Sequence, residues 1–82
     1  MRTIEFNLPK YYAPALINGD YDGLNDDEMR ILTDFVHNGI FKYGRFDCVG
    51  ADVDNSYFSP FNDLTGMRNI GADVCKYTFI TE

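Results

Sequence analysis

The fold of this chain is decided by the stretch Leu24-Asn-Asp-Asp-Glu-Met-Arg-Ile-Leu-Thr-Asp-Phe-Val-His-Asn38, which predicts an amphipathic helix over Asn25–Asn38. Asn25 is a residue type that caps helix starts well, because its side-chain oxygen accepts a backbone N–H of the first turn. Glu28 follows three residues later, which gives an Asn-x-x-Glu variant of the capping box. The sequence therefore predicts a helix that begins directly after Asn25.

The apolar residues of this helix recur at helical spacing, as expected when one side packs against a core. Gly39 is expected to end the helix, because glycine commonly follows the last helical residue. The buried stripe is predicted to consist of Leu32, Phe35, Val36 and Ile40.

A shorter helix is expected upstream over Lys10–Asn18, and Gly19 provides its C-terminal stop. Pro14 lies in the middle of this segment, where a proline removes a backbone hydrogen bond and clashes with the preceding turn. Two outcomes stay open at this stage: the helix kinks at Pro14, or it begins only there.

The remaining segments have the alternation of apolar and polar residues that is typical of strands. Gly50 interrupts the alternation in one of them and is expected to mark a bulge. Inward-facing positions are predicted at Ile4, Phe6 and Leu8 near the N-terminus and at Cys75, Tyr77 and Phe79 near the C-terminus. Strands are predicted over Arg2–Leu8, Arg45–Asp52, Ser56–Phe61 and Asp73–Thr81, with a loop over Asn62–Gly71.

These elements follow one another in the order β-α-α-β-β-β and predict an α+β fold. A small, mainly antiparallel sheet with two helices packed on one face is the natural arrangement. A chain of 82 residues forms one domain, which we expect to span residues 1–82. The second face of such a sheet is not covered by a helix, and a homodimer formed through this face is one expected arrangement.

The net charge of −6 is unevenly distributed along the chain. Residues 18–34 carry six acidic residues and a single base. Nucleic acids and anionic membranes are disfavoured as direct partners, because binding to either depends on clustered Lys and Arg. We expect an acidic face that binds a basic protein, for example as an inhibitor that occupies a nucleic-acid-binding surface. The residues predicted to form this face are Asp20, Asp22, Asp26, Asp27 and Asp34.

An alternative for the same segment is a weak calcium-binding helix-loop-helix module over residues 18–29. The spacing matches a calcium loop in several oxygen ligands and in Gly23, which provides the sharp turn. Met29 occupies the position of the bidentate Glu, and Glu28 comes one residue early and is needed for the helix cap. The calcium ligands under this alternative are Asn18, Asp20, Asp22, Asp26 and Glu28.

The sequence contains no recognisable catalytic motif, so neither an enzyme nor a cofactor other than calcium is expected. His37 is the sole histidine, and it would have to serve any Cys or Ser nucleophile by itself. Cys48 and Cys75 are too few for a disulfide scaffold and indicate reduced thiols in a cytoplasmic protein. The chain shows no secretory signal and no apolar run long enough for a membrane span.

Residues 8–28 and 75–79 resemble a family of short proteins of unknown function encoded by phages, plasmids and other bacterial mobile elements. The shared features are a Leu-Pro opening at Leu8, an aromatic pair, a Leu-Ile-Asn-Gly-Asp segment, a Gly-Leu-Asn-Asp-Asp-Glu helix start and a terminal Cys-Lys-Tyr-Thr-Phe strand. The resemblance implies an accessory role in a bacterial or phage cytoplasmic setting. It assigns no functional residue.

Overall fold

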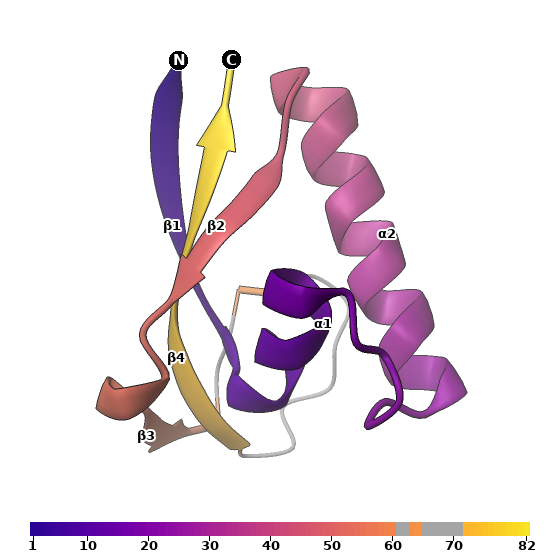
Figure 1. The fold of residues 1–82 in the computed structure, drawn as a ribbon, viewed down its shortest axis with the longest axis vertical. Coiled ribbons are helices and arrows are strands. Elements are labelled where there is room, and N and C mark those ends of the chain that lie inside the picture. Colours follow the sequence, from indigo (N-terminus) through magenta and orange to yellow (C-terminus); the bar gives the residue numbers. More distant parts are fainter. Residues whose placement is uncertain (61–62, 65–71) are drawn as a thin grey trace.

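The computed structural model describes residues 1–60, 63–64 and 72–82 and confirms the predicted α+β fold. Two short 3-10 helices join the predicted elements, and the termini lie beside each other at one end (Figure 1). The elements are β1 (Arg2–Pro9), η1 (Lys10–Tyr12), α1 (Ala13–Asn18), α2 (Asp26–Tyr43), β2 (Asp47–Ala51), η2 (Val53–Asn55), β3 (Tyr57–Ser59) and β4 (Ala72–Thr81).

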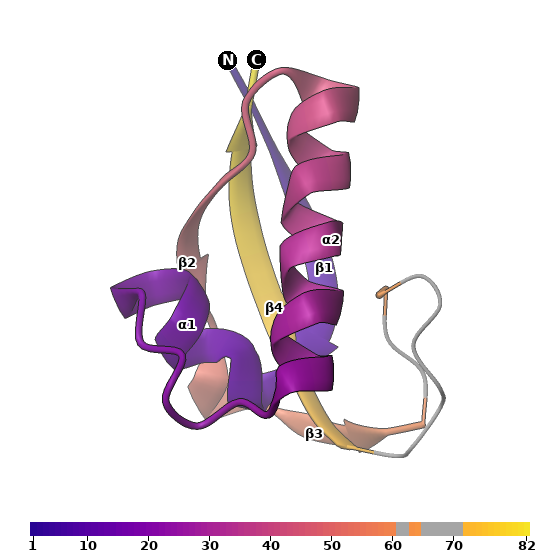
Figure 2. The same cartoon turned by 90° about the vertical axis from the view of Figure 1, so that its right-hand side faces the viewer.

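The last strand, β4, is the centre of the four-stranded sheet. It pairs antiparallel with β1 along one edge, and with β2 and β3 in succession along the other. The register places Phe6 opposite Tyr77 and Leu8 opposite Cys75. Both α-helices cover the same face of this sheet (Figure 2), so the two-layer arrangement expected from the sequence is confirmed.

Aromatic rings fill the space between the sheet and α2. Phe79 is fully buried and stacks on Phe46, with ring centroids 4.2 Å apart. Phe6 meets Phe35 of α2 edge-on at 5.3 Å. Such ring pairs add about 0.5–1.5 kcal/mol beyond the area that they bury, so the aromatic cluster largely fixes where α2 lies on the sheet.

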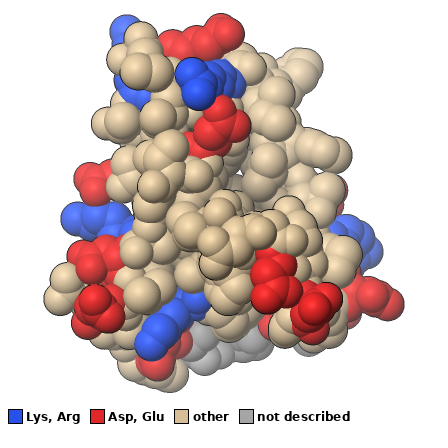
Figure 3. Space-filling model, viewed as in Figure 1, with Lys and Arg blue, Asp and Glu red and all other residues tan. Residues whose placement is uncertain are grey.

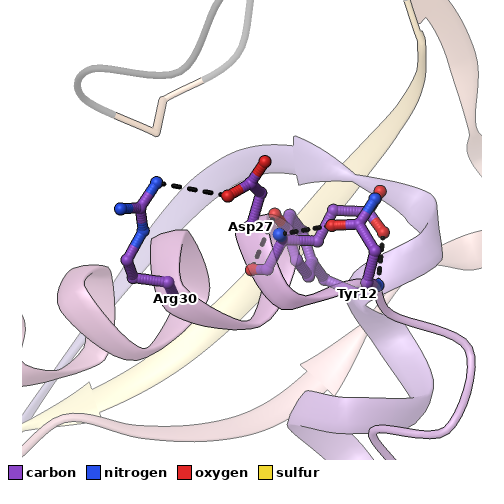
Figure 4. A network of polar contacts seen from close by, with 5 residues as sticks. Tyr12, Asp27 and Arg30 are labelled. Carbon is purple, nitrogen blue, oxygen red and sulfur yellow. Dashed lines mark hydrogen bonds and ion pairs between the residues drawn. The ribbon is translucent and has the colours of Figure 1, made fainter.

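The start of α2 has the capping box that the sequence predicts. The Asn25 side-chain oxygen accepts the Glu28 backbone N–H at 2.8 Å, and the Glu28 carboxylate accepts the Asn25 backbone N–H at 2.9 Å. The Tyr12 hydroxyl donates to the Glu28 carbonyl oxygen at 3.2 Å and ties η1 to this first turn (Figure 4). An exposed pair between Arg30 and Asp27, 3.4 Å apart, lies next to it.

The end of α2 differs from the prediction. The helix continues past Gly39 to Tyr43 and is ended by Gly44, whose φ of 79° suits glycine. Gly39 lies inside the helix because the Phe46 ring packs directly against its backbone, where a Cβ atom would collide with the ring. Ile40 is 45% exposed and does not belong to the buried stripe.

The remaining boundaries follow the prediction with small corrections. The chain forms η1 first, and Pro14 then lies in the first turn of α1, where its missing N–H leaves no helical bond unmade. Gly19, with a φ of 69°, ends α1 as expected. The bulge at Gly50 is confirmed by the register shift between β2 and β4. Phe61 and most of the predicted loop over Asn62–Gly71 lie outside the described residues.

Replacing Gly39 by Ala tests the close approach of α2 to Phe46. Overpacking of this kind costs about 1–3 kcal/mol, and the better helix propensity of Ala returns at most about 1 kcal/mol. We therefore expect Gly39→Ala to lower the free energy of unfolding by about 1–2 kcal/mol in a urea titration. Gly23→Ala is the control, because its Cβ would meet nothing within 4 Å. Equal stability of the two variants would contradict this packing.

Alkaline pH is expected to destabilise the protein. Burial raises the pKa of Tyr12, Tyr77 and Cys75 above the usual values of about 10 for Tyr and 8.5 for Cys. The unfolded chain therefore loses these protons at lower pH than the folded chain, and stability falls as the pH rises through the unfolded-state values. Urea midpoints should fall above about pH 8.5, whereas a constant midpoint up to about pH 11 would contradict the burial of these groups.

Candidate functional site

The five acidic residues predicted to form a face are all exposed. Asp20 and Asp22 lie in the loop between α1 and α2, where the Asp22 backbone N–H donates to the Asp20 carboxylate at 3.1 Å. Asp26 and Asp27 follow in the first turn of α2, where the helix dipole favours negative charge, and Asp34 lies two turns further on. The structure thus places this acidic loop and the first half of α2 next to each other on the surface.

The described charges are also segregated in space. The end of the molecule where β1 ends and α2 and β4 begin, here called the acidic end, carries ten acidic residues against the described bases Lys10, Arg30 and Lys76. Figure 3 shows Asp and Glu atoms on both sides of the lower half of one face, with Lys and Arg atoms among them. The acids of this end are Asp20, Asp22, Asp26, Asp27, Glu28, Asp34, Asp52, Asp54, Asp63 and Asp73.

The rest of the described chain is close to neutral. Glu5 of β1 lies diagonally across from Lys76 of the acidic end, with their charged groups 4.0 Å apart. At the opposite end of the molecule, two acidic residues accompany three bases, namely Asp47 and Glu82 with Arg2, Lys42 and Arg45. The excess of negative charge among the described residues therefore lies at one end of the molecule. The sequence alone indicates only the part of this excess that residues 18–34 contribute.

An apolar cleft opens at the acidic end, and the sequence analysis did not predict it. This cleft, here called the α1 cleft, has a volume of about 790 Å³ and separates η1 and α1 from the end of β2, from η2 and from the start of β4. Most of its wall is apolar, and Ile17 at its edge is 44% exposed. The lining residues are Lys10, Tyr11, Ala13, Pro14, Ile17, Asn18, Ala51, Val53 and Asp73.

A second hollow, the α2 groove, lies between α2 and β1 and has a volume of about 410 Å³. Its floor is aromatic and includes Phe6, Phe35 and Phe46. Its charged lining is balanced, since two bases, Arg30 and Lys42, stand with two acids, Asp34 and Asp63. The groove therefore offers no preference for ligands of either charge.

Comparison with models of known protein families identifies one family that matches most of the chain. Residues 5–80 match the model of a family described as Domain of unknown function (DUF6926). The chain belongs to this family. The match confirms the expected membership of a family of unknown function, and it attaches no activity to any residue. Neither the curated proteins nor the solved structures contain a match to the chain.

The candidate nucleophiles and the histidine are not brought together. His37 is exposed on α2, whereas Cys75 is fully buried under the helices. Burial raises the pKa of both Cys48 and Cys75, so the thiols stay protonated at neutral pH and are poor nucleophiles. The Asp52 carboxylate accepts two hydrogen bonds from the Asn55 amide at 2.9 and 3.0 Å. Among the described helices, none is long and apolar enough to cross a membrane.

The contacts of the described residues disfavour a calcium site in the acidic loop. Asn18 ends α1 and the loop leads into α2, so the helix-loop-helix order is present. The Glu28 carboxylate, however, is held by the Asn25 backbone in the capping box. Within residues 1–60, 63–64 and 72–82, no three His, Cys, Asp or Glu side chains are grouped closely enough to hold a metal ion.

A thermal melt in EDTA and in millimolar calcium tests this alternative. A ligand that binds only the folded state at about 100 times its Kd adds roughly 2.7 kcal/mol, which raises the midpoint of a small domain by several degrees. Because Glu28 serves the helix cap and Met29 cannot ligate calcium, we expect the two midpoints to coincide. A rise with calcium that magnesium does not reproduce would establish the metal site.

Proposed function

We propose that this protein is a non-catalytic interaction protein of a phage or other mobile element, and that its acidic end binds a basic protein partner. The observation that carries the proposal is the segregation of the described charges: ten acidic residues against three bases at one end, and near neutrality elsewhere. The mobile-element setting rests on the sequence resemblance, and the same setting implies the cytoplasm of a bacterial host.

The five acids of the predicted face are exposed and therefore accessible to a partner. Among the five predicted face residues, Asp27 alone forms an ion pair within the described chain, and its partner Arg30 is itself exposed. A surface of one sign attracts an oppositely charged protein from a distance and raises the association rate. Binding should therefore weaken steeply as the ionic strength increases.

The sign of the charge selects the class of partner. Nucleic acids and anionic membranes are repelled by the acidic end, whereas proteins that bind nucleic acids expose clustered Lys and Arg. A host nucleic-acid-binding protein is thus the partner that best complements this surface. By occupying the basic surface of such a protein, the acidic end would act as an inhibitor of nucleic-acid binding.

A homodimer through the open sheet face remains a weaker proposal. The face of the sheet away from the helices carries Thr3, Glu5, Lys76 and Thr78, with the Glu5–Lys76 pair across two strands. Antiparallel sheets commonly leave such a polar face in water, so a dimer is not needed to cover it.

The proposal predicts that removing charge from the acidic end weakens partner capture. The triple variant Asp20→Asn, Asp22→Asn, Asp34→Asn keeps each side chain's size and leaves the helix cap intact. Surface charge pairs contribute about 0.2–1 kcal/mol each, so losing three should weaken binding by about tenfold. Affinity capture from a bacterial lysate, quantified by mass spectrometry, identifies the partner, and titration calorimetry with that partner measures the loss.

The control removes the same number of charges elsewhere. The variant Glu5→Gln, Asp47→Asn, Glu82→Gln changes the net charge equally but lies outside the acidic end. It should retain the partner at an affinity close to that of the wild type. Partner binding that also survives the addition of Asp26→Asn and Asp27→Asn to the first triple variant would contradict the proposal.

A further inference from the structure

The α1 cleft lies within the acidic end and is framed by its acidic residues. Asp73 lines the cleft directly, and Asp52 and Asp54 flank the lining residue Val53 on the η2 side. On the α1 side, the acidic loop with Asp20 and Asp22 follows directly after the lining residue Asn18. The apolar hollow is thus formed by segments that are far apart in the sequence, and acidic residues adjoin these segments along the chain on both sides.

The floor and walls of the cleft suit an apolar side chain. Ala13, Pro14, Ile17, Ala51 and Val53 contribute only carbon atoms beyond their backbones. Small residues on both walls leave the space open, and the aliphatic edge of Ile17 is already 44% exposed to water. Burying an apolar group of a partner here would remove both surfaces from water, which is favourable by about 25 cal/mol per Å².

We propose that the α1 cleft binds one apolar anchor side chain of a partner protein segment in which Lys or Arg residues flank the anchor. This inference rests on the proposed function and adds the point of attachment and the sequence chemistry of the partner. The anchor enters the apolar hollow, and the flanking bases face Asp52, Asp54 and Asp73 on one side and the acidic loop on the other. The charges select a basic segment, and the hollow selects a segment with a suitable apolar residue.

The apolar lining of the α1 cleft and the acids next to it distinguish this cleft from the rest of the described surface. Among the described lining residues, the charges balance in both hollows, with two bases and two acids in the α2 groove and Lys10 with Asp73 in the α1 cleft. The preference of the α1 cleft for a basic segment therefore rests on the acids that adjoin its lining along the chain. Phe41, which is 94% exposed on α2, lies outside the lining of both hollows. Lys10 is the one base among the described residues that line the α1 cleft, so Lys10→Gln should strengthen the binding of a basic segment.

Three short synthetic peptides test the proposal without knowledge of the natural partner. The first has one Leu between pairs of Arg in a Gly/Ser background. The second replaces the Leu by Ser, and the third keeps the Leu but replaces every Arg by Gln. Each is titrated at low ionic strength into the full-length, ¹⁵N-labelled protein, and the backbone amide shifts are mapped by NMR.

We expect the first peptide to shift the amides of Ala13, Ile17, Ala51 and Val53 in a saturable manner. Loss of a Leu anchor worth about 1.5–3 kcal/mol should weaken the second peptide by about tenfold or more. The third peptide should also bind more weakly than the first, because the acidic frame no longer contributes.

A pair of matched variants ties the binding to the cleft. Ile17→Arg places bulk and positive charge at the edge of the cleft and should abolish the cleft shifts with the first peptide. Ile40→Arg adds the same charge at a site of nearly equal exposure, 45% against 44%, but on α2 outside both hollows. This control should bind the first peptide almost as the wild type does.

The remaining outcomes separate the two proposals. If both Arg-containing peptides bind equally and shift only the amides around Asp20–Asp34, the cleft inference is overturned while the acidic end keeps its function. If the Leu peptide without Arg binds as well as the first peptide, charge selection at the cleft is wrong. If no peptide shifts any amide of the acidic end, both the inference and the proposed function fail.

Discussion

Tyr77 lies in the middle of the central strand with its ring fully buried, and its hydroxyl donates to the carbonyl oxygens of Pro9 and Lys10 at 2.7 and 3.2 Å. These carbonyls belong to the point where the chain leaves β1 and turns into η1. A buried carbonyl without a partner costs about 1–3 kcal/mol, so this contact fixes the turn against β4. Two residues after Lys10, Tyr12 donates to the Glu28 carbonyl and connects the same corner to the start of α2. Two tyrosine hydroxyls therefore tie η1 to β4 and to the start of α2, and the aromatic cluster holds the rest of α2 on the sheet.

The tyrosine contacts at this corner also place the segments that form the surface that we propose as functional. Because η1 is held against β4, α1 runs beside the end of β2 and η2 and leaves the α1 cleft between them. The chain then returns through the acidic loop to the capped start of α2, which brings Asp20 and Asp22 to the same end as Asp52, Asp54 and Asp73. The buried residues give stability, and the tyrosine contacts connect them to the end of the molecule that carries the exposed acids.

The sequence predicts the elements well where the signal is local. The capping box at Asn25, the stop at Gly19 and the inward positions of Tyr77 and Phe79 depend on neighbouring residues and are confirmed. The end of α2 is predicted wrongly, because Gly39 is retained for contact with Phe46, a residue outside the helix. The acids of residues 18–34 are recognisable from the sequence because they are neighbours along the chain. The α1 cleft, and the presence of Asp52, Asp54 and Asp73 at the acidic end, depend on contacts between distant segments and are not recognisable in this way. They come together only through the pairing of β4 with β2 and β3.

Hydrogen exchange of the variant Tyr77→Phe tests most directly whether one buried hydroxyl positions this corner. The substitution keeps the ring and removes the donor to the Pro9 and Lys10 carbonyls. Tyr57→Phe, at an exposed position of β3, serves as the control. We expect Tyr77→Phe to lower the free energy of unfolding by about 1–3 kcal/mol. Hydrogen exchange should accelerate most at the amides of η1 and α1 and least in the second half of α2. Unchanged stability, or faster exchange spread evenly over the molecule, would contradict this expectation.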